Sequence, residues 1–258
     1  AEEGTTPVYN IYRGLLAGLR EKSDLDMLFK GTTKLLCSVY ESDNTYLPWS
    51  AKKITCFQEV LVLLWKSLDE NGAFLSHVLQ HEDITRVVTP LCYFMWIGRL
   101  HPQRVGLINI CTFNLLLLSG FRNFGVDLNR PFDVSMPIVD LPRFAGTHAD
   151  FLIIVLHKMV VAGHPSLRTL HPWYLTILCN ISPYVKNIGL VASGKLASLW
   201  ETLSSPRFLL AAPKHHEFVE QMLEMFNNFV QYQYEGSTHL VYALVRREAS
   251  FRRLASMT

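Results

Sequence analysis

Apolar side chains recur every three to four residues along most of the chain, which is the spacing of one face of an α-helix. Between residues 50 and 72, for example, one face is formed by Ile54, Phe57, Leu61, Leu64 and Leu68, and Asn71-Gly72 then breaks the pattern. The same period predicts helices at about 6–19, 23–39, 73–80, 83–97, 102–119, 148–161, 173–181, 190–203, 214–232 and 238–247. Sustained apolar/polar alternation, which indicates a β-strand, is confined to weak candidates within 126–141. The sequence therefore predicts an all-α protein.

Several helix starts carry capping signals. Thr6-Pro7 combines an N-cap residue with Pro at the first helical position, Ser23 stands three residues before Asp26, and Ser50 and Asp83 precede apolar helical runs. We expect these residues to open their helices.

The predicted helices are mostly about 10 to 20 residues long and are joined by short connections with Pro or Gly at the breaks. This favours stacked antiparallel helix pairs, as in an α-solenoid of the HEAT or armadillo type, over an irregular bundle. A weak internal repeat supports the solenoid, because Asn114, Asn180 and Asn228 each lie in an apolar helix that is followed by a polar turn. The three positions are 66 and 48 residues apart, and removing an insertion of about 25 residues from the first interval leaves a spacing typical of such units. We expect residues 1–258 to form a single helical-repeat region.

An Asn amide inside an apolar helix needs hydrogen-bond partners, because burying it unpaired costs free energy. In armadillo arrays a comparable Asn faces a groove and holds the backbone of an extended peptide. Asn114, Asn180 and Asn228 could line such a groove, or they could bond free carbonyls of neighbouring helices. The sequence leaves both alternatives open.

One long segment, residues 120–146, shows no helical period and contains three Gly and three Pro residues. Apolar side chains stand at nearly every second position, which argues against disorder, so we expect an ordered non-helical strap packed over the helix ends. Its charged residues alternate in sign, which suits either salt bridges that fix the strap or display to a partner. The residues we expect at a partner contact are Arg122, Asn123, Asn129 and Arg130.

Composition narrows the function classes. A net charge of only +2 excludes a strongly basic nucleic-acid binder. Charged residues make up 18% of the chain, below the ~25% usual in soluble domains, so we expect a partly apolar surface that receives partners. The most apolar run, 105–118, is shorter than the ~20 residues that cross a bilayer, and it is expected to be a buried helix.

The five cysteines are odd in number and widely spaced, and most of them lie in apolar runs. We expect all five to be buried hydrophobic residues in a reducing compartment, without a disulfide framework.

Candidate catalytic residues occur in the run GTHAD, which brings together Thr147, His148 and Asp150. A small hydrolase built on His148 and Asp150 is one alternative function. Thr147 and Asp150 also have the spacing of a capping box before an apolar helix, and we expect that role.

Other histidines fail the spacing that metalloproteases require. His81 has no second His four residues later, and His215-His216-Glu217 lacks the H-E-x-x-H order. Phosphate-binding Gly-rich loops and a nucleophile elbow are also absent from the sequence. We therefore expect no enzymatic activity, no cofactor, no metal and no small-molecule substrate.

The strap carries the most specific signal in the sequence. The run SGFRNFGVDLNRPF, followed by GTHADFLIIVLHK, resembles the characteristic run of the high-temperature-induced dauer formation protein family, which is grouped with dymeclin. The runs YLPWSAKKITCFQEVLVLLWK, CNISPYVKN and LEMFNNFVQYQYEG are similar to that family as well, so that the resemblance covers roughly residues 25–257. Family members are much longer than this chain, and we expect it to be an internal fragment.

The resemblance implies a non-catalytic cytoplasmic protein that is peripherally associated with the Golgi and trans-Golgi network. It would act in trans-Golgi sorting, secretory or dense-core vesicle formation and Golgi organisation, through contacts with other proteins of the trafficking machinery. Contact with the Golgi membrane surface would be made through the parent protein. The resemblance supplies no site residues, because the family has no catalytic motif to map. An armadillo-like peptide-binding adaptor, with Asn114, Asn180 and Asn228 lining a groove, is the alternative.

Overall fold

The computed structural model describes residues 10–45, 54–81 and 84–256. Within these ranges the helices are α1 Ile11–Gly18, α2 Lys22–Asn44, α3 Phe57–Glu70, α4 Gly72–Gln80, α5 Ile84–Gly98, α6 Val105–Ser119, α7 Arg122–Asp127, α8 His148–Ala162, α9 His171–Ile181, α10 Leu190–Leu203, α11 Pro206–Leu209, α12 His215–Tyr232, α13 Thr238–Val245 and α14 Glu248–Ala255. Short 3-10 turns occupy Pro102–Arg104, Pro165–Leu170 and Glu235–Ser237. These residues contain no β-strand, only an isolated bridge between Pro131 and Thr147, so the all-α prediction is confirmed.

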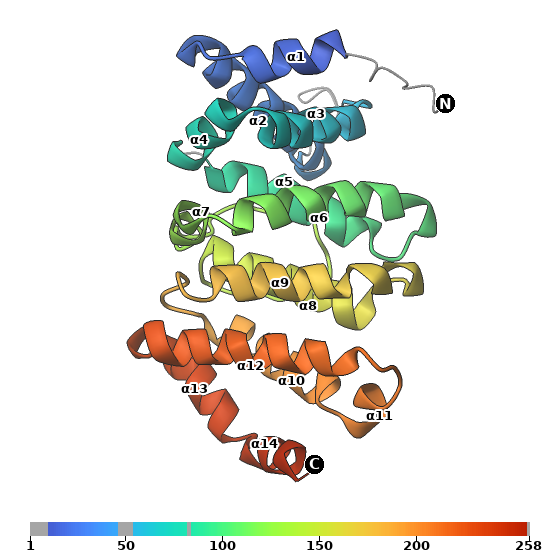
Figure 1. Cartoon of the computed structure of the whole chain (residues 1–258), viewed down its shortest axis with the longest axis vertical. Coiled ribbons are helices and arrows are strands. Elements are labelled where there is room, and N and C mark those ends of the chain that lie inside the picture. Colours follow the sequence, from blue (N-terminus) through green and yellow to red (C-terminus); the bar gives the residue numbers. More distant parts are fainter. Residues whose placement is uncertain (1–9, 46–53, 82–83, 257–258) are drawn as a thin grey trace, which may run out of the picture.

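The longer helices form two rows along the long axis of the molecule (Figure 1). In one row α3, α6, α9 and α12 contact each other in chain order, and in the other α2, α5, α8, α10 and α13 do so. The rows touch through the pairs α2–α3, α5–α6, α8–α9 and α10–α12. Each central helix therefore packs against neighbours along its own row and across to the other row.

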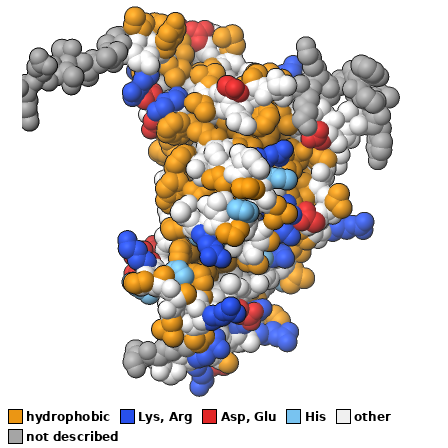
Figure 2. Space-filling view, turned by 90° about the vertical axis from the view of Figure 1, so that its right-hand side faces the viewer, with side chains coloured by type: hydrophobic (Ala, Val, Ile, Leu, Met, Phe, Trp, Pro, Cys, Tyr) orange, Lys and Arg blue, Asp and Glu red, His pale blue; other side chains and the backbone are white. Residues whose placement is uncertain are grey.

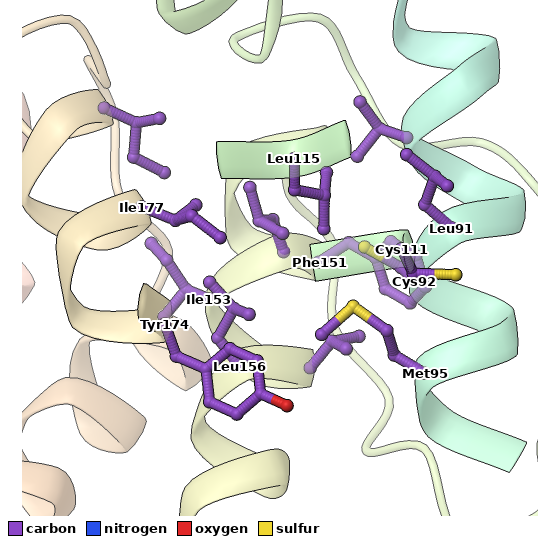
Figure 3. Close-up of a cluster of buried hydrophobic side chains, with 14 of the residues drawn as sticks. Leu91, Cys92, Met95, Cys111, Leu115, Phe151, Ile153, Leu156, Tyr174 and Ile177 are labelled. Carbon is purple, nitrogen blue, oxygen red and sulfur yellow. The ribbon is translucent and has the colours of Figure 1, made fainter. Parts of the chain in front are cut away.

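The buried side chains form one continuous cluster that runs between the rows. Figure 3 shows its middle, where Met95 of α5, Cys111 and Leu115 of α6, Phe151 of α8 and Tyr174 of α9 point toward one another. Nearly every residue of α5 is buried, as is most of α8, because these helices are covered on several sides. Each fully buried Leu, Ile or Phe contributes about 1.5–3 kcal/mol, so the two central helices anchor the fold.

Pro90 lies inside α5 and has no N–H to offer the carbonyl of Arg86 four residues earlier. The thiol of Cys37 in α2 donates to this carbonyl, with 3.5 Å between sulfur and oxygen. The neighbouring helix thus supplies the hydrogen bond that α5 lacks.

The cysteine prediction is confirmed in part. All five cysteines are free, and Cys37, Cys92 and Cys111 are buried. Cys179 is only half-buried, and Cys56 is exposed at the N-cap of α3, so the expectation that all five are buried is wrong. The side chain at the start of α3 faces water although the following sequence is apolar.

The predicted helix starts have mixed outcomes. Ser23 lies inside α2, which begins at Lys22 after Glu21 without a side-chain cap, so its predicted capping role is wrong. Thr6-Pro7, Ser50 and Asp83 themselves lie outside the described residues. The first helix nevertheless begins later than predicted, at Ile11, where the Asn10 side chain accepts a hydrogen bond from the N–H of Arg13. The helix predicted from Ser50 begins only at Phe57, because residues 54–56 are not helical. Asn71 separates α3 from α4 as predicted, and its side chain accepts a hydrogen bond from the N–H of Phe74.

Candidate interaction surface

The strap, residues 120–146, opens with a helix that the sequence analysis missed. Phe124 and Leu128, four residues apart and fully buried, place α7 on the core. Gly125 faces Tyr184 so closely that an added Cβ would lie 2.7 Å from the Cδ2 atom of that ring. The expectation of a wholly non-helical strap is therefore wrong for residues 122–127, because this glycine permits a close helix contact rather than ending a helix.

The rest of the strap is non-helical and is fixed at both ends by backbone hydrogen bonds. The N–H of Phe132 donates to the carbonyl of Gly146 at 2.9 Å, and the N–H of His148 donates to the carbonyl of Arg130 at 3.1 Å. The Phe132 ring stacks on Phe151 of α8, with ring centres 4.5 Å apart. The segment between these points is a closed loop held against α8.

Asp140 fixes the middle of the strap. Its carboxylate accepts hydrogen bonds from Trp96 Nε1 of α5 at 2.8 Å and from Nη2 of Arg99, just after α5, at 2.6 Å, and it pairs with Lys158 Nζ of α8 at 3.3 Å. Partial burial acts to raise the pKa of Asp140, but the hydrogen bonds from Trp96 and Lys158 and the charge of Arg99 hold it below its ordinary value. This charged residue serves the first of the two predicted alternatives, a salt bridge that fixes the strap.

The four residues predicted at a partner contact differ in their surroundings. The Asn129 side chain accepts from the N–H of Lys186 at 2.6 Å and donates to the carbonyl of Tyr184 at 2.9 Å, so it joins the strap to the turn after α9. Arg130 pairs with Asp127 at 3.1 Å and is exposed. Arg122 and Asn123 are also exposed. The structure thus brings three of the four to the surface, and their contact with a partner stays a prediction.

Asn114 of α6 is fully buried and faces the preceding helix of its row. Its Nδ2 donates to the carbonyl of Ile110 at 2.8 Å and, at 3.5 Å, to the carbonyl of Leu61 in α3. This is the neighbouring-carbonyl alternative of the sequence analysis. Asn114 is therefore not open to a peptide.

Asn180 and Asn228 reach back along the same row, but to serine hydroxyls. Asn180 of α9 donates to Ser119 Oγ at the end of α6, and Asn228 of α12 donates to Ser182 Oγ just after α9, both at 3.0 Å. Each serine in turn donates to a carbonyl of its own helix. All three asparagines thus donate to the preceding helix of the row or to the residue just after it, although Asn114 donates to a carbonyl and the other two to hydroxyls.

A hollow of about 480 Å³ lies beside the last two links, and Asn180, Asn228, Tyr184, Glu224 and Tyr232 line part of it. Only two of the three groove candidates are therefore brought together at one accessible place.

The GTHAD run forms the capping box that the sequence predicts. Thr147 N–H donates to Asp150 Oδ2 at 2.9 Å, and Asp150 N–H donates to Thr147 Oγ1 at 3.3 Å. The other Asp150 oxygen accepts from the N–H of Gly189 at 2.8 Å. His148 is buried, and this burial lowers its pKa to about 4. Both Asp150 carboxylate oxygens accept from backbone amides, so this carboxylate serves the capping role and does not support the hydrolase alternative.

One group of chemically reactive side chains escaped the sequence analysis. Asp26 of α2, His77 of α4 and His81 just after α4 bring three possible metal ligands together. The second histidine stands four residues before His81, whereas only the position four residues after it was considered. That spacing was visible in the sequence, but the contribution of Asp26 from a different helix was not.

Apolar side chains cover much of the molecular face in Figure 2, with Lys and Arg scattered among them. Large apolar side chains with more than half of their surface exposed include Leu210, Val139 and Leu190. This agrees with the partly apolar surface expected from composition. In the described parts of the chain, no helix is both long enough and apolar enough to cross a membrane.

Residues 2–258 match the family described as "Dymeclin: Dyggve-Melchior-Clausen syndrome protein". The chain belongs to the dymeclin family. It is 44% identical over 248 residues to Protein HID1 of Mus musculus and 43% identical over 248 residues to Protein HID1 of Homo sapiens. Both alignments cover 96% of this chain and 31% of the relative, so the chain spans about a third of the length of these curated proteins.

A more distant relative is named "Ubp5-interacting protein ftp105", from Schizosaccharomyces pombe. It is 26% identical over 253 residues, which cover 97% of this chain and 27% of that protein. No solved structure matches the chain. The family resemblance drawn from the strap motif is thereby confirmed.

Proposed function

We propose that this chain is a non-catalytic scaffold segment of a Golgi-associated protein. It would be a solenoid of the HEAT or armadillo type that acts in trans-Golgi sorting, secretory or dense-core vesicle formation and Golgi organisation. In this proposal the parent protein is cytoplasmic and attaches peripherally to the Golgi membrane.

The observation that carries the proposal is the pair of helix rows, which buries a continuous seam and leaves a long outer surface. Repeated links from Asn114, Asn180 and Asn228 to the preceding helix support a repeat architecture. Such surfaces bind other proteins without a reaction centre. Dymeclin-family membership supports the Golgi role, and the name of the fission-yeast relative, which describes it as interacting with Ubp5, supports a role through protein contacts.

Proximity labelling of the parent protein in secretory cells tests the proposal. The substitutions Arg122→Glu and Arg130→Glu reverse two exposed charges on and beside α7, and we expect them to remove a subset of labelled trafficking proteins. Arg168→Glu, an exposed arginine in the 3-10 turn before α9, is the matched control. Thermal unfolding of each purified variant verifies that the fold is retained. Unchanged neighbours in the folded double variant would remove the strap from the interaction surface, and a parent protein that labels no Golgi components would contradict the function itself.

The hollow beside Asn180 and Asn228 favours a second candidate, a peptide-binding adaptor. A displayed library of random peptides, selected on the wild-type chain, tests it. Enriched peptides should lose binding to Asn180→Ala and Asn228→Ala but retain it with Asn227→Ala, an exposed neighbour. Failure to enrich any peptide would contradict the peptide-binding adaptor and leave the scaffold proposal unchanged.

A further inference from the structure

Asp26, His77 and His81 converge although they come from two helices. Nε2 of His77 lies 3.4 Å from Asp26 Oδ1, and Nε2 of His81 lies 3.2 Å from the same oxygen. The histidines are four residues apart, so the end of α4 presents both rings on one side. All three side chains are partly shielded from water, with exposed fractions of 32%, 13% and 14% respectively.

No hydrogen bond to a described residue accounts for the buried position of the His77 ring nitrogen Nε2. This atom is buried and makes no hydrogen bond to the described residues, although it faces the Asp26 carboxylate. A buried polar atom without a hydrogen-bond partner is costly, so each one in a native fold calls for a cause. A cation between the rings and the carboxylate would supply the missing partner.

The spacing of the three atoms suits a tetrahedral ion. Zinc binds imidazole nitrogen and carboxylate oxygen at about 2.0–2.2 Å, which places neighbouring ligand atoms about 3.3–3.6 Å apart. The distance of 3.4 Å from Asp26 Oδ1 to His77 lies within this range and that of 3.2 Å to His81 lies just below it, and all three ligand atoms are within 4.8 Å of one another.

The residues around the cluster determine which atoms could bind a cation. Lys30 Nζ lies 2.6 Å from Asp26 Oδ2, so only Oδ1 is left to act as a single-oxygen ligand. The His81 ring packs against Phe29, with ring centres 4.7 Å apart, which fixes its orientation. The cluster also lies at the C-terminal end of α4, where the helix dipole favours a positive charge.

We propose that Asp26, His77 and His81 bind one zinc ion that ties the end of α4 to α2. Two imidazoles favour zinc over calcium or magnesium, which prefer oxygen ligands. Iron in a site with two histidines and one carboxylate keeps several open positions, whereas Lys30 and Phe29 crowd this cluster. Zinc needs only one further ligand, and a water molecule supplies it.

Calorimetric titration of the tag-free, metal-free chain with zinc chloride tests the site, and Co²⁺ serves as an optical probe of tetrahedral coordination. We expect one equivalent to bind and to raise the unfolding temperature, because an ion that binds the folded state stabilises it. His77→Gln, His81→Gln and Asp26→Asn should each weaken binding more than about tenfold, the lower limit for changes even to groups that only support a ligand. His239→Gln, an exposed histidine on α13, should leave binding unchanged.

Wild-type chain that binds no equivalent of zinc, or His77→Gln chain that binds it as well as the wild type does, would overturn the proposal. If the histidine variants fail to fold, Lys30→Gln decides, because it keeps all three ligands and removes a competing charge from a side chain that is 59% exposed. Its zinc affinity should rise severalfold. An unchanged or lower affinity in this variant contradicts the site.

Discussion

At the residue scale, buried histidines couple the stability of the fold to pH. His157 of α8 is buried with neither ring nitrogen hydrogen-bonded to the described residues. Burial, aided by the charges of Lys195 and Lys158, lowers its pKa to about 4. In the unfolded chain a histidine takes up a proton near pH 6.5, so the unfolded state binds more protons between about pH 6.5 and 4. The folded state therefore loses stability as the pH falls through that window, because burial opposes protonation of His157.

The substitution His157→Leu tests this coupling. We expect the free energy of unfolding at pH 7 to rise by about 1–2 kcal/mol, because an apolar side chain of similar size removes two unpaired polar atoms from the core. The loss of stability between pH 7 and 5 should also become smaller. Urea unfolding at both pH values measures the two effects, with the exposed His239→Leu as control. An equally steep loss in both variants would contradict the role of His157.

Gly125 provides a second test at this scale. In Gly125→Ala the new Cβ would meet Tyr184 at 2.7 Å, so we expect a destabilisation of about 1–3 kcal/mol from overpacking. Gly194 of α10 is the matched control, because a Cβ there has no neighbour within 4 Å. Gly194→Ala should stabilise the helix by about 0.5–1 kcal/mol. The unfolding temperature should thus fall for Gly125→Ala and rise for Gly194→Ala. A rise in both variants would show that the Tyr184 side chain moves aside at little cost.

At the scale of elements, Asp140 links the strap to α5 and α8. Asp140→Ala leaves the indole N–H of Trp96 without this acceptor and separates Arg99 from the strap. We expect a loss of about 1–3 kcal/mol, together with faster tryptic cleavage after Arg143, which is exposed on the same strap. Asp133→Ala, an exposed strap residue, should change neither quantity. Equal cleavage rates in the two variants would mean that apolar packing alone holds the strap.

The contrast between α7 and α8 shows which elements can be predicted from sequence. The Thr147–Asp150 box is local, since both partners stand within one helical turn, and the sequence therefore predicts it correctly. The short helix α7 is not predictable in this way, because Gly125 acts through Tyr184, which lies far away in the chain. Asp26 and His77 are likewise joined only by the packing of α2 against α4. Helical period specifies the elements, whereas partners brought together by tertiary packing need coordinates.

At the scale of the whole molecule, we expect the backbone amides to be less protected from hydrogen exchange toward the two ends of the helix rows than in their middle. Nearly all of α5 and most of α8 are buried, whereas α1 and α14 contain no buried residue. Amide hydrogens exchange slowest where many buried contacts hold a helix in place, so we expect those of α5 and α8 to exchange slowest with solvent. Hydrogen exchange followed by mass spectrometry measures the gradient. Uniform exchange rates along the chain would mean that the two rows of helices open as a single cooperative unit.

The cysteines differ in burial, so the rate at which each thiol is alkylated can report how often the helices around it open. Burial raises the pKa of Cys92 and of Cys111, and an alkylating reagent attacks the thiolate rather than the thiol. Cys56 is exposed and should be alkylated first, so its rate gives the reactivity of the reagent toward an accessible thiol. The delay before Cys92 and Cys111 react then measures how often α5 and α6 separate, without any engineered label.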